Sequence, residues 1–113
     1  MLRAATGLEQ AGRLREAAAA YAAIAERWPD SLAGWIGLGN AACAAGDLDD
    51  AEAAFRTAAT RHPNAAAAWN NLAHVLGQKG RRVEAVAAAQ RAVRLGGPNG
   101  MMYRETLREV AGG

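Results

Sequence analysis

The sequence has 113 residues, 51% of them apolar, and a formal net charge of +2 at pH 7. A chain of this length forms one domain and buries about two-thirds of the surface that its unfolded form exposes. Alanine accounts for 31 residues, whereas only six are Phe, Tyr or Trp, so the core must form by close approach of backbones. Alanine is also the strongest helix former and no β-branched or aromatic runs occur, so the composition predicts an all-α protein.

The charged and cysteine residues exclude several classes of function. The twelve arginines and one lysine form no basic stripe interleaved with aromatics, so we expect no nucleic-acid partner. The single cysteine, Cys43, excludes an internal disulfide and a cysteine-rich zinc site. No apolar run approaches the ~18 residues that cross a membrane, and no signal peptide is recognisable. We therefore expect no membrane partner and leave the compartment open, with the cytoplasm as the default.

The chain repeats itself every 34 residues. The positions that keep this step are Gly12, Gly46 and Gly80; Ala17, Ala51 and Ala85; Trp35, Trp69 and Tyr103; and Leu8, Ala42, Leu76 and Val110. Pro29 and Pro63 keep it too, whereas Pro98 comes one residue late. Repetition at this period indicates stacked helical units, because one unit alone cannot bury its apolar face.

Within each unit the pattern predicts a helix, a turn and a second helix. The apolar residues of the second unit recur at steps of three and four, which is typical of one helix face: Trp35, Leu38, Ala42, then Leu48, Ala51, Phe55 and Ala58. Gly46 lies between the two helices, where a left-handed residue ends a helix. The predicted N-caps follow the prolines, at Asp30, Asn64 and Asn99. We predict helices over residues 1–11, 14–27, 31–45, 48–61, 65–79, 82–95 and 100–111.

These residues resemble the tetratricopeptide repeat, whose pattern is W-x2-L-G-x2-Y, then A-x3-F, then P. The second unit carries it as Trp35, Leu38, Gly39, Ala42, Ala51, Phe55, Ala58 and Pro63, and departs from it at Ala42, where tyrosine is usual. The third unit departs at Arg82 and Ala89, and Met1 takes the tryptophan position of the first. The resemblance implies a right-handed superhelical solenoid in one domain, residues 1–113. Its units lie near 1–31, 32–65 and 66–99, with a capping helix at 100–111.

The two ends of the chain differ. The last predicted helix has an apolar face and a charged face, as a capping helix requires. The first begins at Met1 without a cap, so we expect a fragment of a longer protein, with a short stand-alone protein as the alternative. The ending "LGGPN…YRETLREV" is similar to tails of bacterial proteins that join a cysteine-peptidase domain to such repeats. That similarity would place any chemistry outside these residues.

The stretch "GLGNAA" at 37–42 fits the dinucleotide-binding pattern G-x-G-x-x-A. A nucleotide site needs a strand before the turn and free amides at a helix start. This stretch lies in the middle of a predicted helix, and Gly39 becomes Ala73 one unit later. A close-packing position accepts that change, so we interpret Gly39 as a packing residue and predict no cofactor.

Two further sets of residues suggest chemistry without supporting it. Cys43 and His74 would lie on neighbouring first helices, but no orienting group or oxyanion donors accompany them. Asp49 and Asp50 are adjacent and therefore point to different sides of a helix. We predict no enzyme activity, no catalytic residue and no metal site.

The resemblance implies a binding surface, because the first helices of such repeats line a concave groove. The residues predicted to face it are Ile36, Gly37, Asn40, Asn70, Asn71, His74 and Gln78. In the family, asparagines at the positions of Asn40 and Asn71 often hold the backbone of a bound peptide, since an amide both donates and accepts hydrogen bonds. Gly37 and Gly77 predict room for side chains. We therefore predict a scaffold that binds a peptide or a partner protein.

Two alternatives to this scaffold stay open. The first is a structural or self-association module. The first helix leaves Leu8 and its neighbours available to an upstream domain or to a second copy, which would give a homodimer. The second is the non-catalytic tail of a larger enzyme.

Overall fold

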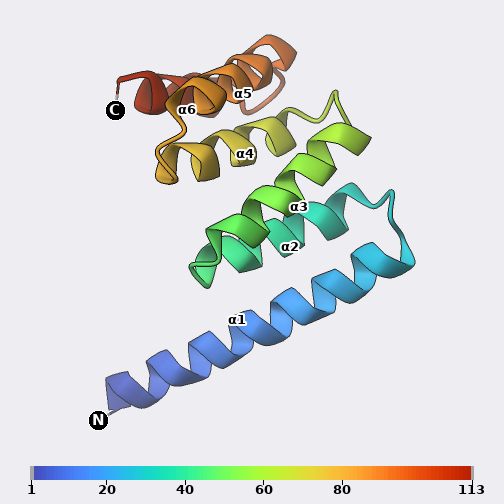
Figure 1. Ribbon diagram of the computed structural model, residues 1–113, viewed down its shortest axis with the longest axis vertical. Coiled ribbons are helices and arrows are strands. Elements are labelled where there is room, and N and C mark those ends of the chain that lie inside the picture. The colour runs from blue at the N-terminus through green and yellow to red at the C-terminus, as the bar shows by residue number, and fades with distance from the viewer. Residues whose placement is uncertain (1, 113) are drawn as a thin grey trace. The chain divides into compact units, whose positions relative to one another are not determined.

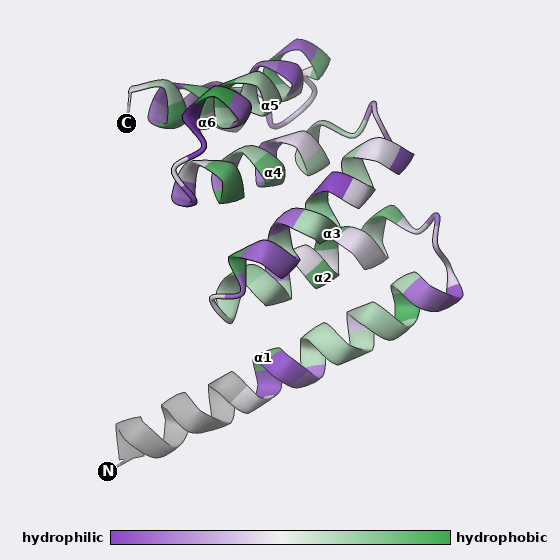
Figure 2. Cartoon of the chain, viewed as in Figure 1, coloured by the Kyte–Doolittle hydropathy of each residue, from purple (hydrophilic) through white to green (hydrophobic). Residues whose placement is uncertain are grey.

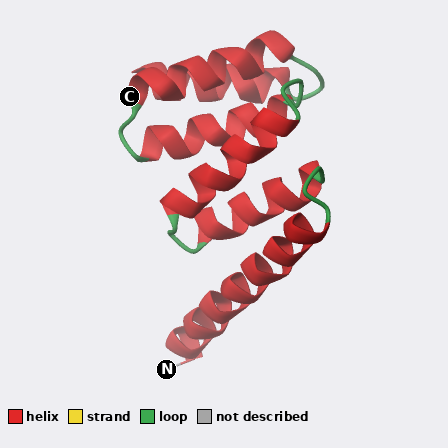
Figure 3. Cartoon of the chain, turned by 45° about the vertical axis from the view of Figure 1, so that its right-hand side comes forward, coloured by secondary structure: helices red, strands yellow, loops and turns green. Residues whose placement is uncertain are grey.

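The computed structural model describes the backbone of residues 2–112 and the side chains of residues 12–112, and it is built of α-helices (Figure 1). The helices are α1 (Leu2–Arg27), α2 (Leu32–Ala44), α3 (Leu48–Arg61), α4 (Ala66–Gln78), α5 (Arg82–Leu95) and α6 (Gly100–Gly112). Short loops join them, and no strand occurs within residues 2–112 (Figure 3). The predicted all-α class is confirmed, and α2 to α6 begin and end within one residue of the prediction.

The turn predicted at Gly12 is wrong. α1 continues through Gly12 as one helix of 26 residues, and Gly12 does not have a positive φ. Gly46 and Gly80, in the same register, have φ of 85° and 77° and follow the ends of α2 and α4. Glycine permits a left-handed turn but does not impose one, because it also adopts helical angles. The repeat register therefore predicted where a turn is possible, and packing decided where it forms.

Backbone hydrogen bonds close the turns at Gly46 and Gly80 in the same way. The N–H of Asp47 donates to the carbonyl of Ala42 at 2.9 Å, and the N–H of Gly46 donates to that of Cys43 at 3.1 Å. The equivalent bonds after α4 are Arg81 to Leu76 at 2.9 Å and Gly80 to Gly77 at 3.1 Å. This is the Schellman arrangement, which satisfies the last carbonyls of a helix.

Contacts group the chain into two compact units, Met1–Ala54 and Phe55–Gly113. In the first unit α1 packs against α2. A Cβ added to Gly37 would lie 2.3 Å from Cε1 of Tyr21, and one added to Gly34 would lie 3.1 Å from Cγ2 of Ile24. The small residues of α2 therefore let side chains of α1 lie against its backbone. Gly37 was predicted to clear space in a groove, and this is wrong because the Tyr21 ring occupies that space.

In the second unit α5 packs against α4 and α6, and α4 also contacts α6. α4 buries Leu72, Val75 and Leu76, and the larger side chains of Phe55 and Tyr103 are buried on α3 and α6. The buried residues of α5 are all alanine: Ala85, Ala88, Ala89 and Ala92. Small side chains on α5 let its backbone approach α4, as the alanine-rich composition predicted. Figure 2 shows this composition as long pale-green stretches on the helices.

The start of each middle repeat is fixed by its tryptophan. Nε1 of Trp35 donates to the carbonyl of Pro29 at 2.7 Å, and Nε1 of Trp69 donates to that of Pro63 at 2.9 Å. Each bond joins the first turn of a helix to the proline loop before it. A buried or half-buried indole usually finds such a partner. The two bonds give α2 and α4 the same entry geometry.

The predicted N-caps of α2 and α4 are wrong by one residue. Ser31, not Asp30, caps α2, and its Oγ accepts a hydrogen bond from the N–H of Gly34 at 3.1 Å. Ala65, not Asn64, holds the equivalent position before α4 and offers no side-chain hydrogen bond. Sequence pattern identified the loop correctly but could not distinguish two adjacent positions within it.

Candidate functional site

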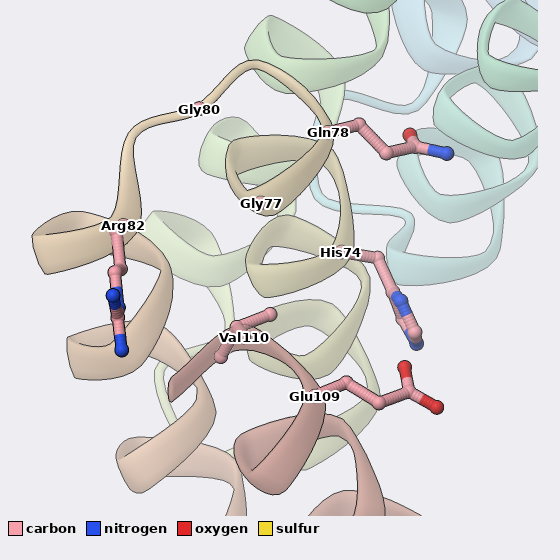
Figure 4. Close-up of a pocket in the computed structure, with 7 residues that line it drawn as sticks. All are labelled: His74, Gly77, Gln78, Gly80, Arg82, Glu109 and Val110. Carbon is pink, nitrogen blue, oxygen red and sulfur yellow. The ribbon is translucent and has the colours of Figure 1, made fainter. Parts of the chain in front are cut away.

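A hollow of about 450 Å³ lies in the second unit, between the C-terminal parts of α4 and α6 (Figure 4). Its lining residues are His74, Gly77, Gln78, Gly80, Arg82, Glu109 and Val110, and we call it the α4–α6 hollow. A Cβ added to Gly77 would lie 3.1 Å from Cγ1 of Val110, so the two helices approach closely at this point. In Figure 4 the side chains of His74, Gln78 and Glu109 extend to one side of this contact, and that of Arg82 lies on the other.

A buried threonine orients His74. Thr106 is 2% exposed, and its hydroxyl donates to the carbonyl of Met102 at 3.1 Å. Its Oγ1 also lies 3.2 Å from Nε2 of His74. A hydroxyl has one proton, so the second contact requires Nε2–H of His74 to be the donor. In the neutral ring Nδ1 is then an acceptor, available to an N–H group of a ligand.

Arg82 explains one departure from the repeat pattern. It stands in the register of Leu14 and Leu48, at the first position of α5. Its guanidinium donates to the backbone carbonyl of Ala111, in the last turn of α6. The last carbonyls of a helix lack intrahelical donors, and a cation there also suits the helix dipole. Arg82 therefore ties the start of α5 to the end of α6 beside the hollow.

The structure separates the predicted site residues. Of the seven, His74 and Gln78 line the α4–α6 hollow and are exposed. Asn40 is exposed on α2, in the first unit. Ile36 and Asn71 are half-buried. The hollow thus brings two of the predicted residues together with side chains of α6.

The prediction that Asn70 faces a groove is wrong. Asn70 is only 3% exposed, and within the described part of the chain its Oδ1 has no hydrogen-bond partner. It lies one turn before Ala73, which is fully buried, and it shares that inward-facing side of α4. An unpaired buried carbonyl costs about 1–3 kcal/mol. Asn70 is therefore a buried residue in this structure and not a surface contact.

Sequence reasoning missed the contribution of α6. The sequence predicted a capping helix at residues 100–111, with no site on it. A signal was available, because the 34-residue register makes α6 the equivalent of α4, and first helices were the ones expected to bind. The missing information was that the ends of α4 and α6 leave a hollow between them.

Residues 12–112 were searched for a metal site and for a membrane-spanning helix. No group of three or more His, Cys, Asp or Glu side chains in that range could hold a metal ion. Over the same residues, none of the helices combines the length and the apolar character that crossing a membrane requires.

Comparison with known proteins confirms the predicted resemblance. A family model described as tetratricopeptide repeat matches residues 2–58 and 36–99. No curated protein matches the chain by sequence. Two solved structures of a type III secretion translocator chaperone, SycD of Yersinia enterocolitica, are similar at 21% identity and cover 96% of this chain. One has a TM-score of 0.79 and is covered over 79% of its length. The other, in complex with a peptide of the translocator YopD, has a TM-score of 0.80 and is covered over 87%.

Proposed function

Because the chain belongs to the tetratricopeptide-repeat family, we propose that it is a non-catalytic interaction module that binds an extended peptide segment of a partner protein at the α4–α6 hollow. One observation carries this proposal: the hollow combines an apolar wall with polar side chains that extend to one side of it. Gly77 and Val110 form the apolar part, and His74, Gln78 and Glu109 supply hydrogen-bonding groups. The peptide bound by the similar chaperone is consistent with this use of the fold.

The chemistry of the hollow matches a peptide backbone. An extended peptide presents N–H and carbonyl groups alternately, and it needs both acceptors and donors. Nδ1 of neutral His74 and the carboxylate of Glu109 are acceptors, and the amide of Gln78 is both. The space beside Gly77 and Val110 accepts a small apolar side chain. Asn40, exposed on α2 of the first unit, stays a separate predicted peptide contact of that unit.

Selection of ligands from a peptide library, followed by titration of the selected peptide, tests this proposal. The variant His74→Ala with Gln78→Ala removes two hydrogen-bonding groups, and we expect its affinity to fall about 10- to 100-fold. Gln90→Ala is the matched control, since Gln90 is an exposed polar residue of α5 outside the hollow. Equal affinity in the double variant and the control, with unchanged helical melts, would refute the proposal.

A second candidate function, self-association through α1, is favoured by the uncovered face of that helix. Tyr21 is 37% exposed, and the run from Ala19 to Ala23 is exposed throughout. In a helix–turn–helix repeat, the first helix of the unit covers this face of the second. Residues 1–11 hold the sequence positions of that first helix. A straight helix cannot fold its first half over its second. A second copy, however, can supply the missing helix by exchange.

Sedimentation or light scattering tests this second candidate. We expect a dimer that Ala20→Glu dissociates and that Ala67→Glu leaves intact. Ala67 is an exposed alanine of α4, so its change matches the first in charge and in the side chain that is lost. A monomer at every concentration would exclude self-association. The earlier expectation for Leu8 falls outside the described side chains.

A further inference from the structure

A second hollow, of about 350 Å³, lies over α4 between α5 and the C-terminal half of α3, entirely within the second unit. Buried Leu72 and Leu76 contribute its apolar floor. Three guanidinium groups surround it, those of Arg56, Arg91 and Arg94. We call it the arginine hollow. It shares no lining residue with the α4–α6 hollow.

One carboxylate lines the arginine hollow, and it already has a partner. Oε2 of Glu84 lies 2.8 Å from Nη2 of Arg56, and the two side chains form an ion pair across the helices. Within residues 12–112, no ion pair joins Arg91 or Arg94 to a carboxylate. These two residues are three apart on α5 and are therefore neighbours on its surface. The carboxylate of the lining is thus paired with Arg56, and the two adjacent positive charges of Arg91 and Arg94 line the hollow beside this pair.

Arg91 is held in place by an aromatic ring. Its Cζ lies 5.3 Å from the ring centroid of Trp69, a cation–π distance. Trp69 is fixed in turn by its hydrogen bond to the carbonyl of Pro63. This contact restricts the positions that the guanidinium can take. A guanidinium ordered in this way binds a carboxylate with a smaller loss of side-chain freedom.

The second unit as a whole carries a net positive charge. Residues 55–113 contain nine Lys and Arg against three Asp and Glu, whereas residues 1–54 contain four against eight. A positive unit attracts acidic partners and speeds their association. Nucleic acid is a poorer match, because Trp69 is the one aromatic residue of the lining and Arg91 already contacts its ring, whereas single strands are bound on several stacking aromatics.

From these observations we infer that the arginine hollow binds an acidic peptide segment of a partner protein. A carboxylate of the ligand contacts Arg91 and Arg94, and a neighbouring apolar side chain of the ligand contacts Ala87, the exposed apolar residue of the lining. Arginine suits this role because its donors form paired hydrogen bonds with a carboxylate. The site is separate from the proposed peptide site and does not depend on it.

Fluorescence anisotropy of a labelled peptide with alternating Glu and Leu tests this inference, with an alternating Gln and Leu peptide as the uncharged probe. We expect Arg91→Gln with Arg94→Gln to weaken binding of the acidic peptide about 10-fold or more, and we expect this loss to shrink in high salt. The matched control is Arg104→Gln with Arg108→Gln, which removes the same charge from an exposed face of α6. The control should change affinity by about twofold or less, as expected for a distant exposed charge.

Three results would overturn the inference. They are an equal loss in the two double variants, equal affinity for the charged and uncharged peptides, and tighter binding of single-stranded DNA that the Arg91 and Arg94 changes abolish. Circular dichroism checks that each variant is folded. Arg94→Gln alone, which keeps the stacked Arg91, should retain part of the effect if the double variant unfolds. His74→Ala with Gln78→Ala should bind the acidic peptide normally, so a failure of the first proposal is distinguishable from a failure of this one.

Discussion

Tyr21 of the first repeat and Phe55 of the second hold the same register position, yet 37% of Tyr21 is exposed and only 2% of Phe55. The residues one turn earlier differ in the same way, since Ala17 is half-buried and Ala51 is fully buried. The motif is present in both places, but only the second is fully covered. A repeat motif therefore specifies a face that needs covering, and neighbouring helices determine whether it is covered.

The turn glycines show the reason for this difference. Gly46 and Gly80 turn the chain, whereas Gly12 stays helical. The helices that precede Gly46 and Gly80 carry large residues. Among these, Trp35 and Trp69 donate hydrogen bonds to the preceding proline loops. In the first repeat Met1 takes the tryptophan position and cannot donate such a bond, and Ala4 takes the position of Leu38. Less apolar area is then available to hold a helical hairpin closed.

The largest test of this comparison is truncation of the two aromatic residues. Phe55→Ala leaves a cavity at a position that is almost fully buried, and we expect a loss of about 3–5 kcal/mol in the free energy of unfolding. Tyr21→Ala removes a partly exposed ring and should cost about 1 kcal/mol. Urea denaturation measures both changes. Equal losses would mean that the face of α1 is covered in solution.

Replacing the glycines at positions 80 and 12 with alanine should give the next largest difference in stability, with a loss at the first position and a gain at the second. Gly80→Ala forces a side chain into a left-handed conformation, which costs about 1–2 kcal/mol. Gly12→Ala places the same side chain in a helix with no atom within 4 Å, and we expect a gain of up to about 1 kcal/mol. Thermal denaturation of both variants decides the point. A destabilising Gly12→Ala would show that this position turns.

The contact between Tyr21 and Gly37 is open to a double-mutant cycle. Gly37→Ala gains helix propensity but puts a Cβ within 2.3 Å of the Tyr21 ring, which must move, and we expect a net loss of about 1 kcal/mol. In a Tyr21→Ala background the same change should be neutral or stabilising. Gly77→Ala, with its nearest atom on Val110 at 3.1 Å, is the milder control. Additive effects would show that the ring does not pack on Gly37.

The smallest expected effects come from exchanging the N-caps of two equivalent helices. Ser31 and Ala65 are 34 residues apart and have similar backbone angles. Ser31→Ala removes the hydrogen bond to the N–H of Gly34 and should cost about 1 kcal/mol. Ala65→Ser supplies the missing acceptor to α4 and should gain a similar amount, about 0.5–1 kcal/mol. Chemical denaturation measures both, and a neutral Ala65→Ser would contradict the equivalence of the two loops.

The sequence was sufficient to predict the helical class, the 34-residue register and the bounds of α2 to α6, because helix periodicity and turn glycines are local signals. It was not sufficient for features that depend on neighbours. Three such features are the burial of Asn70, the contact of Tyr21 with Gly37 and the hydrogen bond between Thr106 and His74. Each depends on which residues of other helices lie nearby. Of the predicted site, His74 and Gln78 lie in a hollow because α6 supplies its other wall.

The indole hydrogen bonds of Trp35 and Trp69 have a spectroscopic consequence. One lies in each compact unit, and each bond breaks when its helix leaves the preceding loop. Trp28, which is 55% exposed, emits as a solvated indole whether or not the units open. Replacing it with phenylalanine, and then one of the other two, would leave a single emitter per molecule. A shift of that emission toward longer wavelength would report opening of each unit separately.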